Sequence, residues 1–220
     1  MTSIDLYGDG IGKVELIDHM GTDLTIVNAA RVSYGKHKTI FDDADRKLIR
    51  YLLVNGHTSP LEQVCVSFRF TVPLFVRSQH HRHRTWMVNE ISRRYTSDDI
   101  QFYYPPCWRT QSKNNKQMSD EDFQSEELDW MVREHCEISY ARYQRMIEAG
   151  VAREMARMIL PQNLYTQYYG TVSLHNACHF LKLRLHPHAQ WEIQRVAWAM
   201  KEIMRGLYPE TMKIWEELNA

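Results

Sequence analysis

Apolar and polar side chains alternate strictly over residues 64–72, VCVSFRFTV, and this is the clearest pattern in the chain. A period of two predicts a half-buried β-strand, which Pro73 ends. The apolar face of this strand consists of Val64, Val66, Phe68, Phe70 and Val72. Residues 12–21, GKVELIDHMG, predict a short strand that leads into a turn.

Helical spacing takes over on the N-terminal side of the alternating strand. Asp23 is placed to cap a helix through TIVNAARVS. Residues 41–56 predict a second helix, which starts at Asp42 or Asp43 and stops at Gly56. Its apolar stripe consists of Leu48, Tyr51 and Leu52.

The middle of the chain changes character several times. Residues 74–83 predict a helix with Leu74 and Phe75 packed inward, and residues 82–95 follow as an irregular loop or an interrupted helix. Residues 105–118 are polar and led by prolines, which predicts a surface loop.

Helices dominate the rest of the chain. Ser119 and Asp122 resemble a capping box at the start of a long helix that continues to Gly150. Further helices are predicted over residues 151–160, 174–184 and 188–208. The sequence shows no βαβ repeat and no glycine-rich dinucleotide turn. We therefore expect an α+β class, a helix-rich fold with a small sheet, formed as a single domain over residues 1–220.

Composition narrows the classes of function. Lys plus Arg and Asp plus Glu number 27 each, so the chain of 220 residues has no net charge. A general nucleic-acid-binding protein normally carries a basic excess, so we expect no nucleic-acid partner. The cysteines are widely spaced without a CxxC pair, and no apolar run is long enough to span a bilayer. We therefore expect a reduced cytoplasmic protein with no membrane partner.

Positive charge is concentrated in RHRTWMVNEISRRY, residues 82–95. Arginine forks suit phosphate oxygens, and short polar side chains suit sugar hydroxyls and base edges. The side chains fitted to this task are Gln79, Arg82, His83, Arg84, Asn89, Glu90, Ser92 and Arg94. We interpret the stretch as a site for a nucleotide or another small phosphate, with a solvated surface as the alternative, above all for Arg69 and Arg93.

A cluster formed by His80, His81 and His83 raises the alternative of a metal site. The arginines on both sides of His83 would repel a divalent cation, so we expect no metal. His57, in HTSPLE, is equally compatible with a structural role and with a ligand contact.

A second cationic set lies in the last third of the chain. Arg153 and Arg157 are four residues apart, which places them on one helical face. Arg184 ends the segment LHNACHFLKLR, where it is either a C-terminal charge partner or a group that polarises a carbonyl or stabilises an oxyanion.

The arginine stretch also carries a family resemblance. Arg82-His83-Arg84, seven further residues and Ser92-Arg93-Arg94 resemble the RHR–seven–SxR signature of the flavin-dependent thymidylate synthases. The resemblance extends through NAARVS, HTSPLE, REMAR, LPQNLYT, LKLR and HAQWEIQ. It covers most of the chain apart from residues 105–150.

This resemblance implies a reaction and a set of small molecules. Members of the family make dTMP from dUMP, with 5,10-methylenetetrahydrofolate as one-carbon donor and FAD, reduced by NADPH, as hydride carrier. The resemblance also implies the alternative thymidylate synthase fold with a mostly antiparallel sheet. It further implies a homotetramer whose active sites form between subunits.

The resemblance assigns roles to individual residues. The implied dUMP contacts are Gln79, Arg82, Glu90, Ser92, Arg93, Arg94, Arg157 and Arg184. The implied FAD contacts are His57, Ser59, Arg82, His83, Arg84, Asn89, Glu90, Ser173, His175 and His179. Arg184 resembles the catalytic residue proposed to stabilise the ionised uracil ring and so activate its C5. The chain departs from many members at Met87, where they carry Ser, and at the three positions 173, 175 and 179, where they often carry Asn or Arg.

Rival interpretations fit the residues less well. No His–Asp relay is evident near Ser92, so we assign it to substrate binding and not to nucleophilic attack. Cys107 is followed by Trp108 and not by the His found in the cysteine-dependent thymidylate synthases, so we interpret it as a loop cysteine. A kinase or NTP hydrolase lacks support because the chain has no GxxxxGK[ST] loop. A nucleic-acid-binding protein that stacks bases on Trp86 and Tyr95 is the alternative from another class.

Overall fold

Two nine-residue strands form the centre of a sheet in the computed structural model, which describes residues 2–116 and 118–219. The strand β3 (Cys65–Pro73) confirms the alternating pattern, and its apolar face is buried. The strand β7 (Tyr165–Ser173) pairs antiparallel with β3 along its whole length. Each strand continues directly into a helix, α3 (Leu74–His80) after β3 and α6 (Leu174–Arg184) after β7.

Three shorter strands complete the sheet. They are β1 (Ser3–Asp5), β2 (Lys13–Met20) and β4 (Met87–Glu90). The order is β1-β2-β3-β7-β4, and every neighbouring pair is antiparallel. The strand β2 confirms the prediction for residues 12–21. The strand β4 lies inside the arginine stretch, so the expected loop or interrupted helix over residues 82–95 is wrong there: hydrogen bonds to β7 hold this part as an edge strand.

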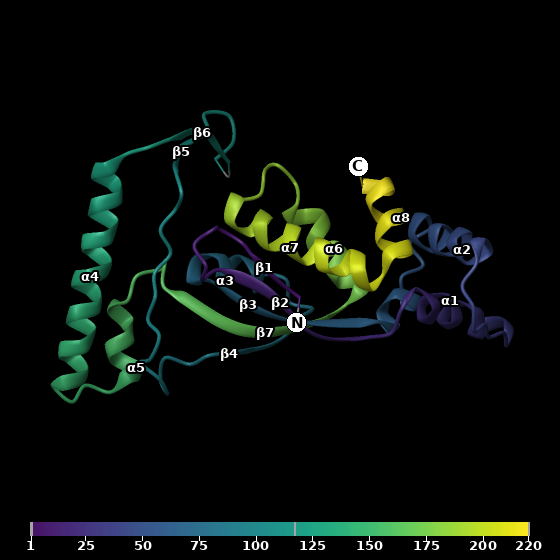
Figure 1. Ribbon diagram of the computed structural model, residues 1–220, viewed down its shortest axis with the longest axis horizontal. Helices are drawn as coiled ribbons and strands as arrows, with labels where there is room; N and C mark the ends of the chain where they lie inside the picture. Colours follow the sequence, from purple (N-terminus) through teal and green to yellow (C-terminus); the bar gives the residue numbers. More distant parts are fainter. Residues whose placement is uncertain (1, 117, 220) are drawn as a thin grey trace.

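The remaining helices surround the sheet (Figure 1). They are α1 (Asp23–Arg31), α2 (Asp43–Val54), α4 (Glu126–Glu148), α5 (Arg153–Ala156), α7 (Trp191–Leu207) and α8 (Pro209–Asn219). The helices α6 and α7 lie over the sheet, α4 and α5 form one end of the molecule, and α1 and α2 form the other (Figure 1). Short 3₁₀ turns cover Val32–Tyr34, Ser59–Gln63 and Arg157–Ile159.

The main core fills the space between the sheet and these helices. Phe68 and Phe70 of β3, Phe180 of α6 and Met200 of α7 are all fully buried within it. Each large apolar side chain buried in this way contributes about 1.5–3 kcal/mol to folding. A smaller cluster beside α4 and α5 is formed by Tyr143, Ala156, Leu160 and Leu164. The expected helix-rich α+β class with a small antiparallel sheet is confirmed.

The N-terminal helices agree with their capping signals in part. Asp42 caps α2 and accepts hydrogen bonds from the backbone nitrogens of Ala44 and Asp45, at 3.0 and 3.1 Å. The cap of α1 is Thr22, one residue before the expected Asp23. Tyr51 is wrongly placed on the apolar stripe of α2, because 57 % of it is exposed.

The region before the long helix differs from the expectation. The strands β5 (Trp108–Gln111) and β6 (Ser119–Phe123) pair as a hairpin, where a loop over residues 105–118 was expected. Residue 117 of that loop lies outside the described residues. Ser119 and Asp122 belong to β6 and do not form a capping box. The helix α4 begins nearly two turns later, where the Ser125 hydroxyl accepts from the backbone nitrogen of Leu128 at 3.3 Å.

The predicted helix over residues 151–160 is also shorter than expected. It consists of α5 and the following 3₁₀ turn, after which Leu160 is extended. A residue before proline is disfavoured in the helical conformation, and Pro161 follows here. The helix expected over residues 188–208 corresponds to α7. Among the described residues, no helix is long and apolar enough to cross a membrane.

Candidate functional site

The arginine stretch and the end of α6 meet because two strand–helix units run toward each other. Since β3 and β7 are antiparallel, α3 and α6 start from opposite ends of the pair. Their C-terminal ends meet in an aromatic cluster, where the ring of His80 lies 4.7 Å from Phe180 and 4.4 Å from Trp86. A Cβ at Gly170 would lie 3.0 Å from the rings of Phe70 and Trp86, so any other residue would push against this packing.

A hydrogen bond joins the two ends directly. Arg184 Nε donates to His83 Nε2 at 3.0 Å. Arginine only donates, so His83 accepts with Nε2 and carries its proton on Nδ1. Burial lowers the pKa of His83 to about 4, and the nearby Arg184 and His179 act in the same direction. The neutral imidazole therefore holds Arg184 in one orientation.

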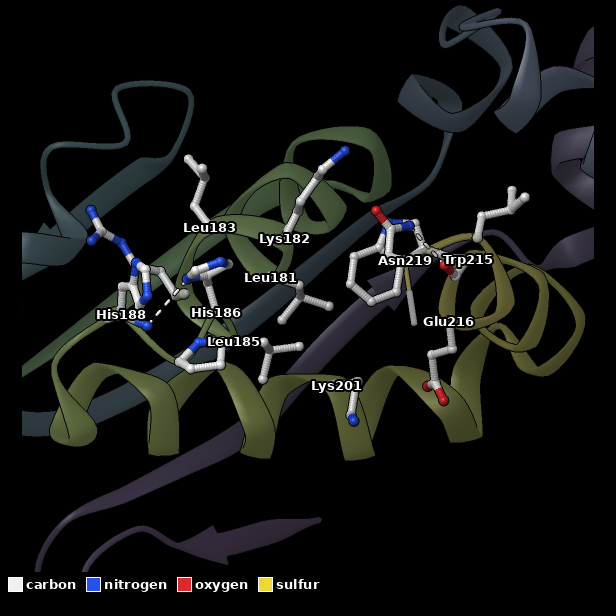
Figure 2. A pocket seen from close by; sticks show the side chains of 14 residues that line it. Leu181, Lys182, Leu183, Leu185, His186, His188, Lys201, Trp215, Glu216 and Asn219 are labelled. Carbon is white, nitrogen blue, oxygen red and sulfur yellow. Dashed lines mark hydrogen bonds between the residues drawn. The ribbon is translucent and has the colours of Figure 1, made fainter.

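The terminal nitrogens of Arg184 remain available for a ligand. They make no hydrogen bond or ion pair with residues 2–116 or 118–219. Arg184 lines a cavity of about 900 Å³ between α6, α7 and α8. His186 and His188 lie at one end of this cavity and Trp215 and Asn219 at the other (Figure 2).

A neighbouring cavity brings three predicted flavin contacts together. His57, His175 and His179 line a space of about 460 Å³, and Lys182 borders both cavities. Ser59 is exposed on the adjoining 3₁₀ turn. Three predicted flavin contacts, His57, His175 and His179, are therefore distant in the sequence but line the same cavity.

Ser173 has a structural task in the same region. Its hydroxyl caps α6 and accepts a hydrogen bond from the backbone nitrogen of Asn176 at 3.4 Å. The Asn176 side chain donates to the same oxygen at 3.2 Å.

Arg82 and Arg84 extend the cationic surface beyond α3. Both are exposed, and neither side chain forms an ion pair or hydrogen bond within the described part of the chain. Exposed guanidinium groups on the same chain as histidine-lined cavities suit a ligand that combines phosphates with flat rings. The donor set therefore fits a dinucleotide cofactor.

Glu90 is held by a separate network on the sheet edge. Its Oε1 accepts from the hydroxyl of Thr166 at 2.6 Å and lies 3.2 Å from Arg77 Nε. Asn89 is exposed on the same strand, β4. Arg77 and Thr166 were not predicted as site residues. The alternation of buried and exposed residues in β7 could have indicated Thr166. The pairing of Arg77 with Glu90 could not be foreseen, because it depends on how β4 pairs with β7.

The second half of the signature lies in a loop with its own internal contacts. Arg93 donates to the backbone carbonyls of Asp98 and Asp99, the latter at 3.2 Å, and burial lowers the pKa of Arg93. Arg94 lies over the ring of Tyr95, 5.2 Å from its centre. Ser92 Oγ accepts from the backbone nitrogen of Arg94 at 3.3 Å. Arg93 thus stabilises the conformation of the loop that contains Ser92 and Arg94.

Arg157 belongs to the turn that follows α5 at one end of the molecule, whereas Arg184 ends α6, which lies over the sheet (Figure 1). Arg157 is exposed on this 3₁₀ turn, and its Nε donates to the carbonyl of Glu154 at 3.4 Å. No contact among the described residues joins Arg157 to Arg184. The predicted dUMP contacts therefore divide into two groups within one chain.

Comparison with known proteins identifies the family. The family described as "Thymidylate synthase complementing protein" matches residues 15–210. The chain belongs to this family, the flavin-dependent thymidylate synthases. The resemblance drawn from the RHR–seven–SxR signature is thereby confirmed, as is the prediction of an enzyme.

Several other flavin-dependent thymidylate synthases match nearly the whole chain. A flavin-dependent thymidylate synthase of Thermus thermophilus is 49 % identical over 207 residues, which span 94 % of this chain and 76 % of that protein. That of Kosmotoga olearia is 42 % identical over 204 residues, which span 91 % and 88 %. A solved structure of the UMP/dUMP methylase PolB from Streptomyces cacaoi, bound with 5-Br UMP, gives a TM-score of 0.84. It is 33 % identical and covers 98 % of this chain and 97 % of its own.

Two other predictions about this synthase family member concern its cysteines and histidines. Burial, followed by the charge of Asp122, raises the pKa of the Cys107 thiol, which disfavours the reactive thiolate. Among the described residues, no three His, Cys, Asp or Glu side chains are grouped so that they could hold a metal ion.

Gln79 and its partners complete the site. The Gln79 side chain donates to the side chain of Gln190, which in turn donates to Glu192 at 2.9 Å. Gln190 and Glu192 belong to HAQWEIQ, one of the segments that carry the family resemblance, and neither was predicted as a site residue.

Proposed function

We propose that this protein catalyses the reductive methylation of dUMP to dTMP. The one-carbon donor is 5,10-methylenetetrahydrofolate, and FAD reduced by NADPH carries the hydride. The observation that carries the proposal is the hydrogen bond from Arg184 to neutral His83 beside the cavity, in a chain whose relatives are flavin-dependent thymidylate synthases. Residues 1–220 act as a single domain in this proposal.

Arg184 is the proposed catalytic residue. The C5 of uracil must become electron-rich before it attacks an electrophilic methylene carbon. A guanidinium beside a ring carbonyl oxygen stabilises the negative charge that gathers there when N3 loses its proton. Because His83 occupies only Nε, both terminal nitrogens of Arg184 can face that oxygen.

The remaining arginines bind phosphate in this proposal. Exposed Arg82, Arg84 and Arg94 offer planar donor forks for phosphate oxygens of dUMP and FAD. Glu90, held by Thr166 and Arg77, presents an acceptor to a sugar hydroxyl or ring N–H. The other proposed nucleotide contacts are Gln79, Ser92, Arg93 and Arg157.

FAD fits the surface formed by the two adjoining cavities. His57, His175 and His179 would contact it, and His83, which orients Arg184, would lie beside it. The further proposed contacts are Ser59, Asn89 and Ser173. A bound flavin would supply the hydride chemistry, while the chain supplies binding, orientation and charge.

We infer a homotetramer with active sites between subunits. The separation of Arg157 from Arg184 within one chain supports this inference, since a second copy could bring the two groups together. Exposed apolar side chains at and beside β4, namely Met87, Val88 and Ile91, support it as well.

The experiment is a flavin titration followed by an assay of product. The purified protein is mixed with FAD, desalted, and reduced with NADPH without oxygen, with and without dUMP. We expect retained flavin, bleaching that dUMP accelerates, and dTMP once methylenetetrahydrofolate is added. The same experiment is run with UMP in place of dUMP for comparison, because the Streptomyces cacaoi structure is described as a UMP/dUMP methylase.

A different result would point elsewhere. Protein that retains no flavin and does not respond to dUMP would contradict the proposal. Salt-sensitive binding of an oligonucleotide would then support the nucleic-acid-binding alternative.

A further inference from the structure

A buried carboxylate is connected by hydrogen bonds to Gln79, one of the proposed nucleotide contacts. Glu192, in the first turn of α7, is only 2 % exposed. Arg109 Nη2 donates to its two oxygens at 2.7 and 2.9 Å, and the Tyr103 hydroxyl donates to Oε1 at 3.1 Å. These donors fix the carboxylate in one position, although Glu192 is not among the proposed ligand contacts.

Gln190 connects this carboxylate to Gln79. Gln190 Nε2 donates to Glu192 Oε2 at 2.9 Å, and Gln79 Nε2 donates to Gln190 Oε1. Both glutamines are half-buried. The three side chains thus form one line of hydrogen bonds, which we call the amide relay.

The chemistry of the groups sets the direction of the amide relay. An ionised carboxylate only accepts hydrogen bonds, whereas a primary amide donates at nitrogen and accepts at oxygen. Glu192 therefore requires Gln190 to face it with Nε2, which leaves the Gln190 oxygen toward Gln79. Gln79 must in turn face Gln190 with its own Nε2.

One atom of Gln79 is then left over. No residue in 2–116 or 118–219 donates a hydrogen bond to Gln79 Oε1, and this oxygen is not among the fully buried polar atoms. An accessible carbonyl oxygen in a fixed direction suits a ligand hydroxyl or N–H. A ligand that presents only an acceptor there would leave two oxygens facing each other.

We propose that Glu192 is a positioning residue, which acts through Gln190 to hold the Gln79 carbonyl oxygen toward a hydrogen-bond donor of the nucleotide. This inference rests on the proposed function, because it takes Gln79 to contact dUMP. It adds two residues to the determinants of nucleotide binding and states the polarity of the contact.

The first test is E192Q, in which the amide can donate to Gln190 and so reverse the relay. We expect the KM for dUMP to rise about 10-fold, the effect of one lost hydrogen bond, while kcat changes less than about threefold. E15Q is the matched control, since Glu15 is 6 % exposed and accepts two hydrogen bonds from Arg69 at 2.8 Å. E15Q removes a similar buried ion pair outside the relay and should keep the wild-type KM.

The second test moves the charge along the relay. In the double variant Q190E/E192Q, the carboxylate at position 190 again forces Gln79 to donate with Nε2. We expect its KM for dUMP to return to within about threefold of wild type, which a merely structural role of Glu192 would not produce. In a Q79A background, E192Q should cause no further rise in KM.

These outcomes separate the relay from the proposed function. Wild type that forms dTMP, together with E192Q at the wild-type KM, would overturn the relay alone. The relay would also be overturned if E192Q and Q79A raise KM additively. This comparison of E192Q with and without Q79A is the deciding test if circular dichroism shows that Q190E/E192Q is unfolded. Wild type that forms no dTMP would overturn the proposed function.

Discussion

His83 binds Arg184 through a single nitrogen, and this sets what the arginine can do. The Nε–H is occupied, while the terminal nitrogens have no hydrogen-bond or ion-pair partner in residues 2–116 and 118–219. A neutral acceptor suits this task because a protonated imidazole would repel the guanidinium. Burial, which lowers the pKa of His83 to about 4, keeps it neutral at physiological pH.

Replacing Arg184 by lysine should therefore separate charge from geometry. A lysine keeps the charge but offers no planar fork, so it cannot hold His83 and a uracil carbonyl in the same arrangement. We expect R184K to lower single-turnover dTMP formation about 100-fold or more. R205K is the matched control, since Arg205 forms ion pairs with Glu202 and Glu216 away from the site. Equal rates for both variants would contradict the role of Arg184.

Individual arginines could be predicted from the sequence, but their partners could not. The signature identified Arg82, His83 and Arg84, and the structure places His83 against Arg184, a residue 101 positions away. Arg93, at the unspecified position of the SxR half, was an implied dUMP contact as well, yet it donates to carbonyls of its own loop. Residue type indicates the chemistry, whereas only packing decides which guanidinium is already occupied.

At the level of elements, the start of α6 has a structural and a ligand-binding interpretation. Ser173 caps this helix, and the resemblance also implies that it contacts FAD. Ser125 caps α4 by the same kind of hydrogen bond, at 3.3 Å, outside the proposed site. The two serines form a matched pair.

We expect S173A and S125A each to lower the free energy of unfolding by about 1 kcal/mol, measured with urea. Only S173A should also lose FAD on desalting. If both variants retain flavin equally, Ser173 is a helix cap and not a flavin contact.

The success of element prediction followed the strength of the local pattern. The strand β3 was predicted because it is long and alternates strictly. The strand β7 was missed although Thr166, Tyr168 and Val172 are buried on one face of the strand and a signal was present. The strand β4 gave no such signal, because it is a four-residue edge strand with three exposed side chains that pairing with β7 holds in place.

At the level of the whole molecule, the buried His80 and the half-buried His83 link stability to pH. Burial lowers the pKa of His80 well below its usual 6.5, with His81, His83 and Arg184 acting in the same direction, and lowers that of His83 to about 4. The unfolded chain therefore binds more protons than the folded chain between these values. The contribution of these histidines to the free energy of unfolding is fully present above pH 6.5 and decreases as the pH falls below that value.

We expect the temperature midpoint of unfolding to decrease as the pH is lowered from 6.5 to 4. H83Q should make this decrease less steep, because up to about one proton fewer is taken up on unfolding. Glutamine at position 83 can still accept from Arg184, so the comparison changes titration more than packing. Unfolding followed by circular dichroism across this range is the measurement. An H83Q slope equal to that of wild type would contradict the assignment.

The register of β3 on β7 has a consequence for the spacing of the cationic groups. Arg69 lies opposite Tyr169 at the middle of the pair, and the two strands are equally long, so the helices that follow are related by an approximate twofold rotation. A slip of one residue would shift one strand against the other by about 3.3 Å. That would separate His83 from Arg184 by more than a hydrogen bond can span. The ladder of the central strand pair therefore acts as a ruler that sets the distance between the two halves of the site.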